Sequence, residues 1–369
     1  MLTSEFDYNL PKNLIAQEPA DPRDSSRLMI VDRKNKSVEH KHFYNIVDYL
    51  RPGDLLVWNN SKVFKARLRG TLQLDEEVSQ LKRNNSTLMI VNSAPVEIFL
   101  LRPMENSGVW RVMAKPGRKL RLGMRIRYAE DFSAEVVLKE NDGTILLQFN
   151  EDDLSVRAKA NKYGEVPTPP YIKDSNSGQN LSDRYQTVYA KNEGSVAAPT
   201  AGFHFTPELI QKIEDKGVQF AEVTLHVGIG TFQPVKTEMV EDHIMHSEWV
   251  EITAKNCDLI NQAKKEGRRV IAVGTTTVRT LEGVAKKYFV DETTSRLKPF
   301  SGDVNIFITP GFEFKIVDAL ITNFHLPKST LLMLTSAFVQ DKDFLFDCYR
   351  IAIESKYKFF SFGDAMLII

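Results

Sequence analysis

A helical pattern over Asn256–Glu266 is followed by Gly267 and two arginines, then by the apolar run Val270-Ile-Ala-Val273 and the polar cluster Gly274-Thr-Thr-Thr277. Glycine commonly ends a helix, and a short apolar run behind it is typical of a buried strand. Gly-Thr-Thr directly after that strand predicts the start of another helix. The stretch therefore predicts alternating helices and strands, the pattern of an α/β sheet.

The same scheme occurs upstream. Thr206 is the predicted N-cap of a helix over Pro207–Lys216, Gly217 ends that helix, and a strand over Phe220–Leu225 follows. The C-terminal body is therefore expected to be α/β, with an apolar helix over Leu331–Phe338. Further short apolar runs predict the buried strands Leu28–Val31, Leu55–Trp58, Val96–Leu101 and Ala319–Thr322.

The region from about Trp58 to Asn150 has a different pattern. Polar and apolar residues alternate, and turn signals such as Lys-Pro-Gly and Asn-Asp-Gly recur. Short strands joined by tight turns predict a small antiparallel barrel or sandwich. We therefore expect a discontinuous α/β domain of residues 1–57 and 156–369, interrupted by a β domain of residues 58–155.

Length and composition bound the class of protein. A chain of 369 residues is expected to form more than one domain, and its Lys+Arg and Asp+Glu counts are both 48, so net charge indicates no partner. Cys257 and Cys348 lie far apart, which favours a reducing cytoplasm over a disulfide framework. The segment Met1–Gln17 lacks the apolar run of a signal peptide, and no apolar run approaches the roughly 18 residues of a membrane span. We expect a soluble, cytoplasmic protein.

Positive charge gathers locally in the predicted β domain. Residues i, i+2 and i+4 of a strand share a face, so Lys65, Arg67 and Arg69 are expected to point together. Such a face is either simply solvated or contacts the phosphates of a nucleic acid. A second basic stretch between residues 102 and 127 includes Arg118, Lys119 and Arg121.

Polar loops follow several of the predicted strands, the arrangement by which open α/β sheets form a ligand pocket. His204 lies between two aromatic residues and is either a packed core histidine or a group that titrates as an acid or base. His226 ends a strand and precedes Gly228, Gly230 and Thr231, which form either a tight turn or a ligand loop.

Three further clusters of polar residues are candidates for the same ligand pocket. His246 and Glu248 lie close to His243, but no third strong ligand has a matching spacing, so no metal site is predicted. The N–H groups and hydroxyls of a Gly-Thr-Thr helix start suit a carboxylate or phosphate. Arg279 and Glu282 share a helix face and would pair there. The remaining candidates of these clusters are Gly274, Thr275, Thr276, Asn323 and His325.

A series of segments resembles one known family, nearly end to end and in the family's own order. That family is the S-adenosylmethionine:tRNA ribosyltransferase-isomerases of queuosine biosynthesis. The segments that carry the resemblance are Phe6–Gln17, Arg51–Val57, Arg184–Ala190, Gly194–Thr206, Thr224–Phe232, Met245–Glu248, Ala272–Glu282, Thr322–Thr330 and Phe359–Leu367.

The resemblance implies a fold and an activity. The family fold is an α/β domain interrupted by a β-barrel. Its members transfer and isomerise the ribosyl group of S-adenosylmethionine onto 7-aminomethyl-7-deazaguanine at the tRNA wobble position, forming epoxyqueuosine and releasing adenine and methionine. The expected partners are thus that tRNA and S-adenosylmethionine, which is consumed as a substrate, with no separate cofactor, no metal and a monomeric enzyme.

This reaction needs acids and bases, and histidine titrates in the required range. The catalytic candidates are therefore His204, His226, His246, Glu248 and His325. Candidate contacts to S-adenosylmethionine are Gly228, Gly230, Thr231, Gly274, Thr275, Thr276, Arg279 and Asn323. Candidate contacts to tRNA are Lys65, Arg67, Arg69, Arg118, Lys119, Arg121 and Arg184.

Two other classes of function fit parts of the pattern. A non-catalytic RNA-binding protein would use the β domain alone, but the histidines that follow strands argue against it. An S-adenosylmethionine methyltransferase would carry an early glycine-rich loop after a strand, which this sequence lacks. The small products of the reaction distinguish all three.

Overall fold

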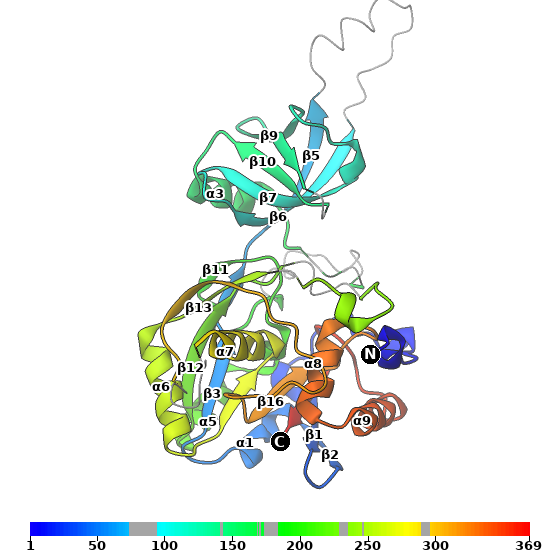
Figure 1. Ribbon diagram of the computed structural model, residues 1–369, viewed down its shortest axis with the longest axis vertical. Coiled ribbons are helices and arrows are strands. Elements are labelled where there is room, and N and C mark those ends of the chain that lie inside the picture. The colour runs from blue at the N-terminus through cyan, green and yellow to red at the C-terminus, as the bar shows by residue number, and fades with distance from the viewer. Residues whose placement is uncertain are drawn as a thin grey trace, which may run out of the picture. The chain divides into compact units, whose positions relative to one another are not determined.

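The computed structural model describes residues 1–73, 94–140, 143–167, 169, 171–172, 184–228, 235–245, 247–288 and 296–369. The chain forms two compact units (Figure 1). The larger unit comprises Met1–Lys62, Pro169–Glu193 and Ala198–Ile369, and the smaller comprises Val63–Thr168 and Gly194–Ala197. The α/β body is therefore discontinuous, as the sequence predicts.

Parallel strands form the centre of the larger unit. In the order β12 (Gln219–Leu225), β3 (Leu55–Asn59), β14 (Val270–Val273) and β16 (Ala319–Asn323), each strand pairs in parallel with its neighbour. All four match apolar runs that the sequence identifies as buried strands, because a strand covered on both faces needs apolar side chains on both. Their carboxyl ends consequently lie along one edge of the sheet.

Antiparallel pairings extend the sheet on both sides, so that nine of the described strands form one mixed sheet. On one side β17 (Ala365–Ile368) lies antiparallel to β16 and parallel to β1 (Arg27–Asp32), which forms a hairpin with β2 (Ser37–His42). On the other side β12 pairs with β13 (Glu248–Ile252), and β13 pairs with β15 (Phe300–Val304).

Helices cover both faces of the central strands (Figure 1). One face packs against α1 (Ile46–Tyr49) and α5 (Pro207–Asp215), while α6 (Ala254–Lys265) and α7 (Thr275–Tyr288) contact the other. Successive side chains of a strand point to opposite faces, so each strand supplies both cores. The core beneath α1 and α5 takes Leu56, Trp58, Ile271, Val273, Ala319 and Ile321 from the strands.

Helix boundaries follow the capping chemistry of the sequence. The predicted N-cap Thr206 accepts the N–H of Leu209 through its hydroxyl. Ser329 and Asp341 cap α8 (Thr330–Val339) and α9 (Lys342–Glu354) in the same way. Gly217 and Gly267 follow α5 and α6 with φ values of +85° and +70°, a conformation that glycine adopts without a steric penalty. The predicted caps at Thr206, Gly217 and Gly267 are confirmed.

The smaller unit is a closed antiparallel barrel in the order β10-β7-β6-β5-β8-β9, which confirms the predicted β module as a barrel. Alternate residues such as Leu68, Ile98 and Ile126 point inward and are buried. The helix α3 (Asp153–Tyr163) also belongs to this unit, and β4 (Ser61–Val63) and β11 (Asn192–Ser195) lie where the chain passes between the units. The barrel strands are β5 (Arg67–Gln73), β6 (Pro95–Pro103), β7 (Val109–Lys115), β8 (Arg125–Ala129), β9 (Phe132–Lys139) and β10 (Ile145–Phe149).

Glu282 on α7 anchors the loop that leads into β16. Its carboxylate accepts the backbone N–H groups of Lys315, Ile316 and Val317 at 2.9, 3.0 and 2.9 Å. Burial nevertheless raises the pKa of Glu282 above its ordinary value. The prediction that Arg279 and Glu282 form an ion pair is wrong. The carboxylate of Glu282 accepts these three N–H groups, and Arg279 forms its ion pair with Glu248 instead.

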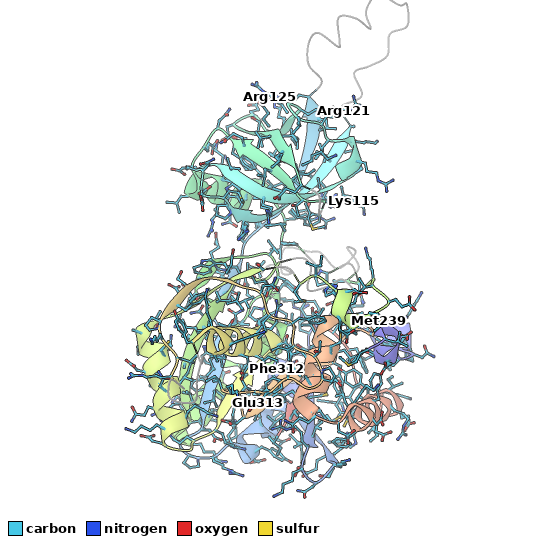
Figure 2. All side chains as sticks on the ribbon, in the orientation of Figure 1. Lys115, Arg121, Arg125, Met239, Phe312 and Glu313 are labelled. Carbon is cyan, nitrogen blue, oxygen red and sulfur yellow. The ribbon has the colours of Figure 1, made fainter. Side chains whose placement is uncertain are left out.

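We expect Glu282→Ala to lower the free energy of unfolding by about 2–4 kcal/mol, because the buried N–H groups of Ile316 and Val317 lose their acceptor. Glu282→Gln keeps one acceptor oxygen and should cost less. The exposed Glu313 of the same loop provides a matched control (Figure 2), since Glu313→Ala should change stability by no more than about 0.5 kcal/mol. Urea denaturation measures all three, and equal losses for Glu282→Ala and Glu313→Ala would contradict the anchoring role.

Candidate active site

A cavity lies at the carboxyl ends of the parallel strands, entirely within the larger unit. It is bordered by the residues that follow β12, β14 and β16, and by the 3-10 turn Thr200–His204. The lining residues are neutral, and none of those described is an aspartate, glutamate, lysine or arginine. They are Tyr171, Ala198, Pro199, Thr200, Ala201, Val227, Gly274, Thr275, Thr276, Thr322, Asn323, Phe324, His325, Leu326, Ser329, Leu331, Phe360 and Ser361.

The N-terminus of α7 forms one wall of the cavity. Gly274, with φ at +87°, turns the chain from β14 into the helix, and its N–H donates to the carbonyl of Ile321 on β16 at 2.8 Å. The first N–H groups of a helix have no carbonyl partner within it and carry partial positive charge. The predicted anion-binding cluster Gly274, Thr275 and Thr276 therefore does lie on a cavity.

Asn323, the last residue of β16, is held by a chain of buried hydrogen bonds. Its Nδ2 donates to Nε2 of His204 at 3.1 Å and approaches the carbonyl of Asp364 at 3.4 Å, while its Oδ1 accepts the hydroxyl of Thr200 at 2.9 Å. Nδ1 of His204 contacts the hydroxyl of Ser26 at 2.7 Å. The orientation of the Asn323 amide is thus fixed from behind the cavity wall.

His204 lies behind the cavity rather than on it. It is only 4% exposed, its ring stacks on Phe43 at 4.9 Å, and both ring nitrogens have partners. Burial, helped by the nearby guanidinium of Arg23, lowers the pKa of His204 to about 3. Of the two interpretations of His204, the packed core histidine is the one that this geometry favours.

His325 does line the cavity. Its Nε2 lies 2.9 Å from the hydroxyl of Thr322, and its backbone N–H donates to the hydroxyl of Tyr349 at 3.0 Å. No described residue bonds Nδ1. Burial lowers the pKa of His325 to about 3, so the ring is neutral near pH 7.

Two further catalytic candidates, His226 and Glu248, are not among the residues that line the cavity. His226 is half-buried, stacks on Trp249 at 5.0 Å between ring centroids, and precedes the lining residue Val227. Glu248, the first residue of β13, forms a buried ion pair with Arg279 on α7, with Oε2 and Nη1 2.7 Å apart. Gly228 is described but is not part of the lining, and Gly230, Thr231 and His246 lie outside the described residues.

The sequence offered no role for several lining residues. Tyr171 follows three prolines that suggest a linker, yet its ring lies 4.8 Å from that of Phe360, and its hydroxyl bonds that of Ser361 at 2.7 Å. Phe360 has φ at +72°, a strained value for a residue other than glycine. Only the segment Phe359–Leu367, singled out for its family resemblance, hinted that this loop has a function.

Comparison with known proteins identifies the family. The sequence profile described as "Queuosine biosynthesis protein" matches residues 3–368. The chain belongs to this family. The predicted resemblance is thereby confirmed, and the chain is an enzyme rather than a non-catalytic binding module.

Relatives of the chain share one name, S-adenosylmethionine:tRNA ribosyltransferase-isomerase. The protein of Thermotoga petrophila is 50% identical over 370 residues, covering 100% of both chains. That of Finegoldia magna is 48% identical over 100% of this chain and 98% of its own. A crystal structure of S-adenosylmethionine tRNA ribosyltransferase from Thermotoga maritima is also similar, with a TM-score of 0.54 and 39% identity over 99% of this chain and 100% of that one.

Cations of the barrel fall into two groups. Arg67 pairs with Glu97, and Arg69 forms two hydrogen bonds to Glu165, at 3.0 and 3.2 Å, so both contact carboxylates of the same unit. Lys65 is half-buried and precedes β5. Arg118, Lys119 and Arg121 are exposed, and Figure 2 shows Arg121 with Lys115 and Arg125 on the barrel.

Arg184 belongs to the larger unit, whereas the other predicted tRNA contacts belong to the smaller one, and the carbonyl of Arg184 accepts a hydrogen bond from the guanidinium of Arg23.

Among the described residues, no helix has both the length and the apolar character needed to span a bilayer. In the same part of the chain, no three histidine, cysteine or carboxylate side chains form a cluster suited to a metal ion.

We expect the rings of His204 and His325 to stay neutral between pH 8 and pH 5, because burial lowers both pKa values to about 3. Side-chain ¹⁵N shifts measured by NMR report ring protonation directly. The unfolded chain takes up these protons near pH 6.5, so the free energy of unfolding should fall as pH drops from about 6.5 to about 3, by roughly 1.4 kcal/mol per pH unit for each ring. A ring that titrates near pH 6 would contradict its burial.

Proposed function

We propose that the chain transfers and isomerises the ribosyl group of S-adenosylmethionine onto 7-aminomethyl-7-deazaguanine at the wobble position of tRNA. The products would be epoxyqueuosine-tRNA, adenine and methionine. Membership of the queuosine biosynthesis family over residues 3–368 carries this proposal. The supporting geometry is a neutral cavity at the carboxyl ends of parallel strands, where α/β enzymes bind small substrates.

The cavity offers a place for each part of S-adenosylmethionine. The methionyl carboxylate fits the N-terminus of α7 at Gly274–Thr276, where N–H groups and the helix dipole favour an anion. Tyr171 and Phe360 present aromatic faces on which a nucleobase stacks. The sulfonium is itself the activated group and is consumed, so the proposed reaction calls for no further cofactor.

His325 is the described histidine best placed for proton transfer. It lines the cavity, its Nε2 is oriented by Thr322, and its neutral ring has a lone pair able to accept a proton from the carbon beside the sulfonium. We assign His204 a positioning role through Asn323, because it does not reach the cavity. His226, His246 and Glu248 remain candidates for the other proton transfers, including protonation of the departing adenine.

The barrel is the proposed tRNA contact. Arg118, Lys119 and Arg121 are exposed and able to contact phosphates, whereas Arg67 and Arg69 would first have to leave Glu97 and Glu165. Lys65 and Arg184 are further candidates, the latter on the larger unit. We propose that the enzyme acts as a monomer in the cytoplasm, where its tRNA substrate is found.

Product identification tests the activity. Incubation with S-adenosylmethionine and precursor tRNA should release adenine and methionine, and His325→Gln should slow adenine release by about 10²–10⁴-fold with tRNA affinity unchanged. His42→Gln, a change of an exposed histidine on β2, is the control and should turn over normally. Formation of S-adenosylhomocysteine would instead indicate a methyltransferase, and normal turnover of His325→Gln would remove His325 from the mechanism.

Charge reversal tests the barrel contact. The double variant Arg118→Glu, Arg121→Glu should weaken tRNA binding, and the slope of log affinity against log salt concentration should become shallower by roughly 1.5–2, as two phosphate contacts are lost. The exposed pair Lys255 and Lys286, reversed in the same way on α6 and α7, matches the change in net charge. Equal effects of the two double variants would show a response to overall charge rather than a barrel contact.

A further inference from the structure

Two threonine hydroxyls on the cavity wall have opposite hydrogen-bonding character. Thr200, Gly274 and Thr276 all line the cavity. A Cβ atom built at Gly274 would lie 3.6 Å from Cβ of Ala201, the neighbour of Thr200, and 3.6 Å from Oγ1 of Thr276. Because each hydroxyl has one hydrogen, its partners in the protein decide whether it presents a donor or an acceptor to a ligand.

The partners of Thr200 make it an acceptor. The atom of Asn323 that approaches the carbonyl of Asp364 must be Nδ2, because a carbonyl only accepts hydrogen bonds. Oδ1 of Asn323 therefore faces Thr200 and takes its hydroxyl hydrogen at 2.9 Å. The lone pairs of Thr200 Oγ1 are then left for the cavity.

His204 fixes the orientation of the Asn323 amide through a second hydrogen bond. Its Nε2 accepts the second Nδ2 hydrogen of Asn323, which requires a neutral ring with its proton on Nδ1, donated to Ser26. The lowered pKa of His204 keeps the ring in that state at physiological pH. A protonated His204 would have no lone pair for Asn323, so the acceptor character of Thr200 depends on this burial.

The partners of Thr276 make it a donor. Oδ1 of Asn59 accepts the backbone N–H groups of Ser61 and Leu225, both at 3.0 Å, which assigns the other amide atom as Nδ2. Nδ2 donates to the carbonyl of Leu225 at 3.0 Å and to Oγ1 of Thr276 at 3.4 Å. The hydroxyl hydrogen of Thr276 has no acceptor in the described part of the chain, and it is available to a ligand together with the N–H groups of α7.

We propose that Thr200 and Thr276 together recognise the α-amino acid end of S-adenosylmethionine, Thr276 donating to the carboxylate and Thr200 accepting from the ammonium. An α-amino acid carries an anionic acceptor and a cationic donor on one carbon, which matches a donor and an acceptor that line one cavity near Gly274. A ribose or an adenine has no such pair of opposite charges. The inference rests on the proposed function and assigns specificity-determining residues to it.

Two truncated substrates test the pairing separately. One is deaminated, with a hydrogen atom in place of the α-amino group, and the other is decarboxylated S-adenosylmethionine. Affinities are measured with saturating precursor tRNA, as KM for S-adenosylmethionine in adenine release and as competitive inhibition constants for both analogues. Thr200→Val and Thr276→Val change each hydroxyl to a methyl group of similar size.

Each variant should lose affinity for S-adenosylmethionine by about 10- to 100-fold, the range for a hydrogen bond to a charged group. Thr200→Val should lower the affinity for the decarboxylated compound by a similar factor. The affinity for the deaminated compound should change by no more than about twofold. Thr276→Val should show the reverse pattern. Thr200→Ser, which keeps the hydroxyl, should restore most of the affinity.

Other outcomes overturn the proposal. Equal losses for both analogues would mean that the substitutions disturb the cavity generally, and unchanged affinity for S-adenosylmethionine would mean that the hydroxyls do not contact it. Failure of the wild-type enzyme to release adenine is a different result, since it would remove the proposed function itself.

Discussion

The parallel pairing of β14 with β3 on one side and β16 on the other is the constraint from which the active site follows. Because these strands run in the same direction, the residues after Val273 and Ile321 emerge at the same edge of the sheet. The N–H of Gly274 continues the ladder by donating to Ile321, which places the start of α7 against the end of β16. The cavity is the space that these ends enclose.

None of the described residues that line the cavity is an aspartate, glutamate, lysine or arginine, and the buried ionisable groups discussed above are paired or neutral. Glu282 is satisfied by three backbone N–H groups and Glu248 by Arg279, while His204 and His325 are neutral because burial lowers their pKa values. Hydroxyls and amides of fixed orientation remain to contact a ligand. Such preorganised dipoles need no rearrangement when a charged substrate binds, which is how enzymes stabilise charge most effectively.

The sequence predicts the framework well because local signals determine it. The apolar runs that form β3, β12, β14 and β16 and the caps at Thr206 and Gly217 are confirmed, since strand burial and helix ends depend on neighbouring residues. The alternation of residues in the barrel likewise predicts its antiparallel strands, and the cluster Gly274–Thr276 predicts one wall of the cavity.

Partners that are distant in the sequence could not be predicted. Arg279 pairs with Glu248 rather than with its helix neighbour Glu282, and Arg69 contacts Glu165 from far along the chain. The alternation of cations along a strand does not show which distant carboxylates, such as that of Glu165, pair with them. His204 shows the same limit, because only the packed fold shows that Ser26 and Asn323 use both of its ring nitrogens.

The position of β17 has a consequence for how this chain acquires its fold. Leu28 of β1 pairs with Ala365 of β17, and among the described strands β17 is the one that joins the hairpin of β1 and β2 to the rest of the sheet. Contacts between residues so far apart in the sequence form late, because closing a long loop lowers the entropy of the chain before the contacts stabilise it. During synthesis the barrel has all its strands long before the sheet does. Until β17 has been synthesised, the edges that β1 and β16 present to it are unpaired and can associate with other chains. A chaperone would be of most use during this interval.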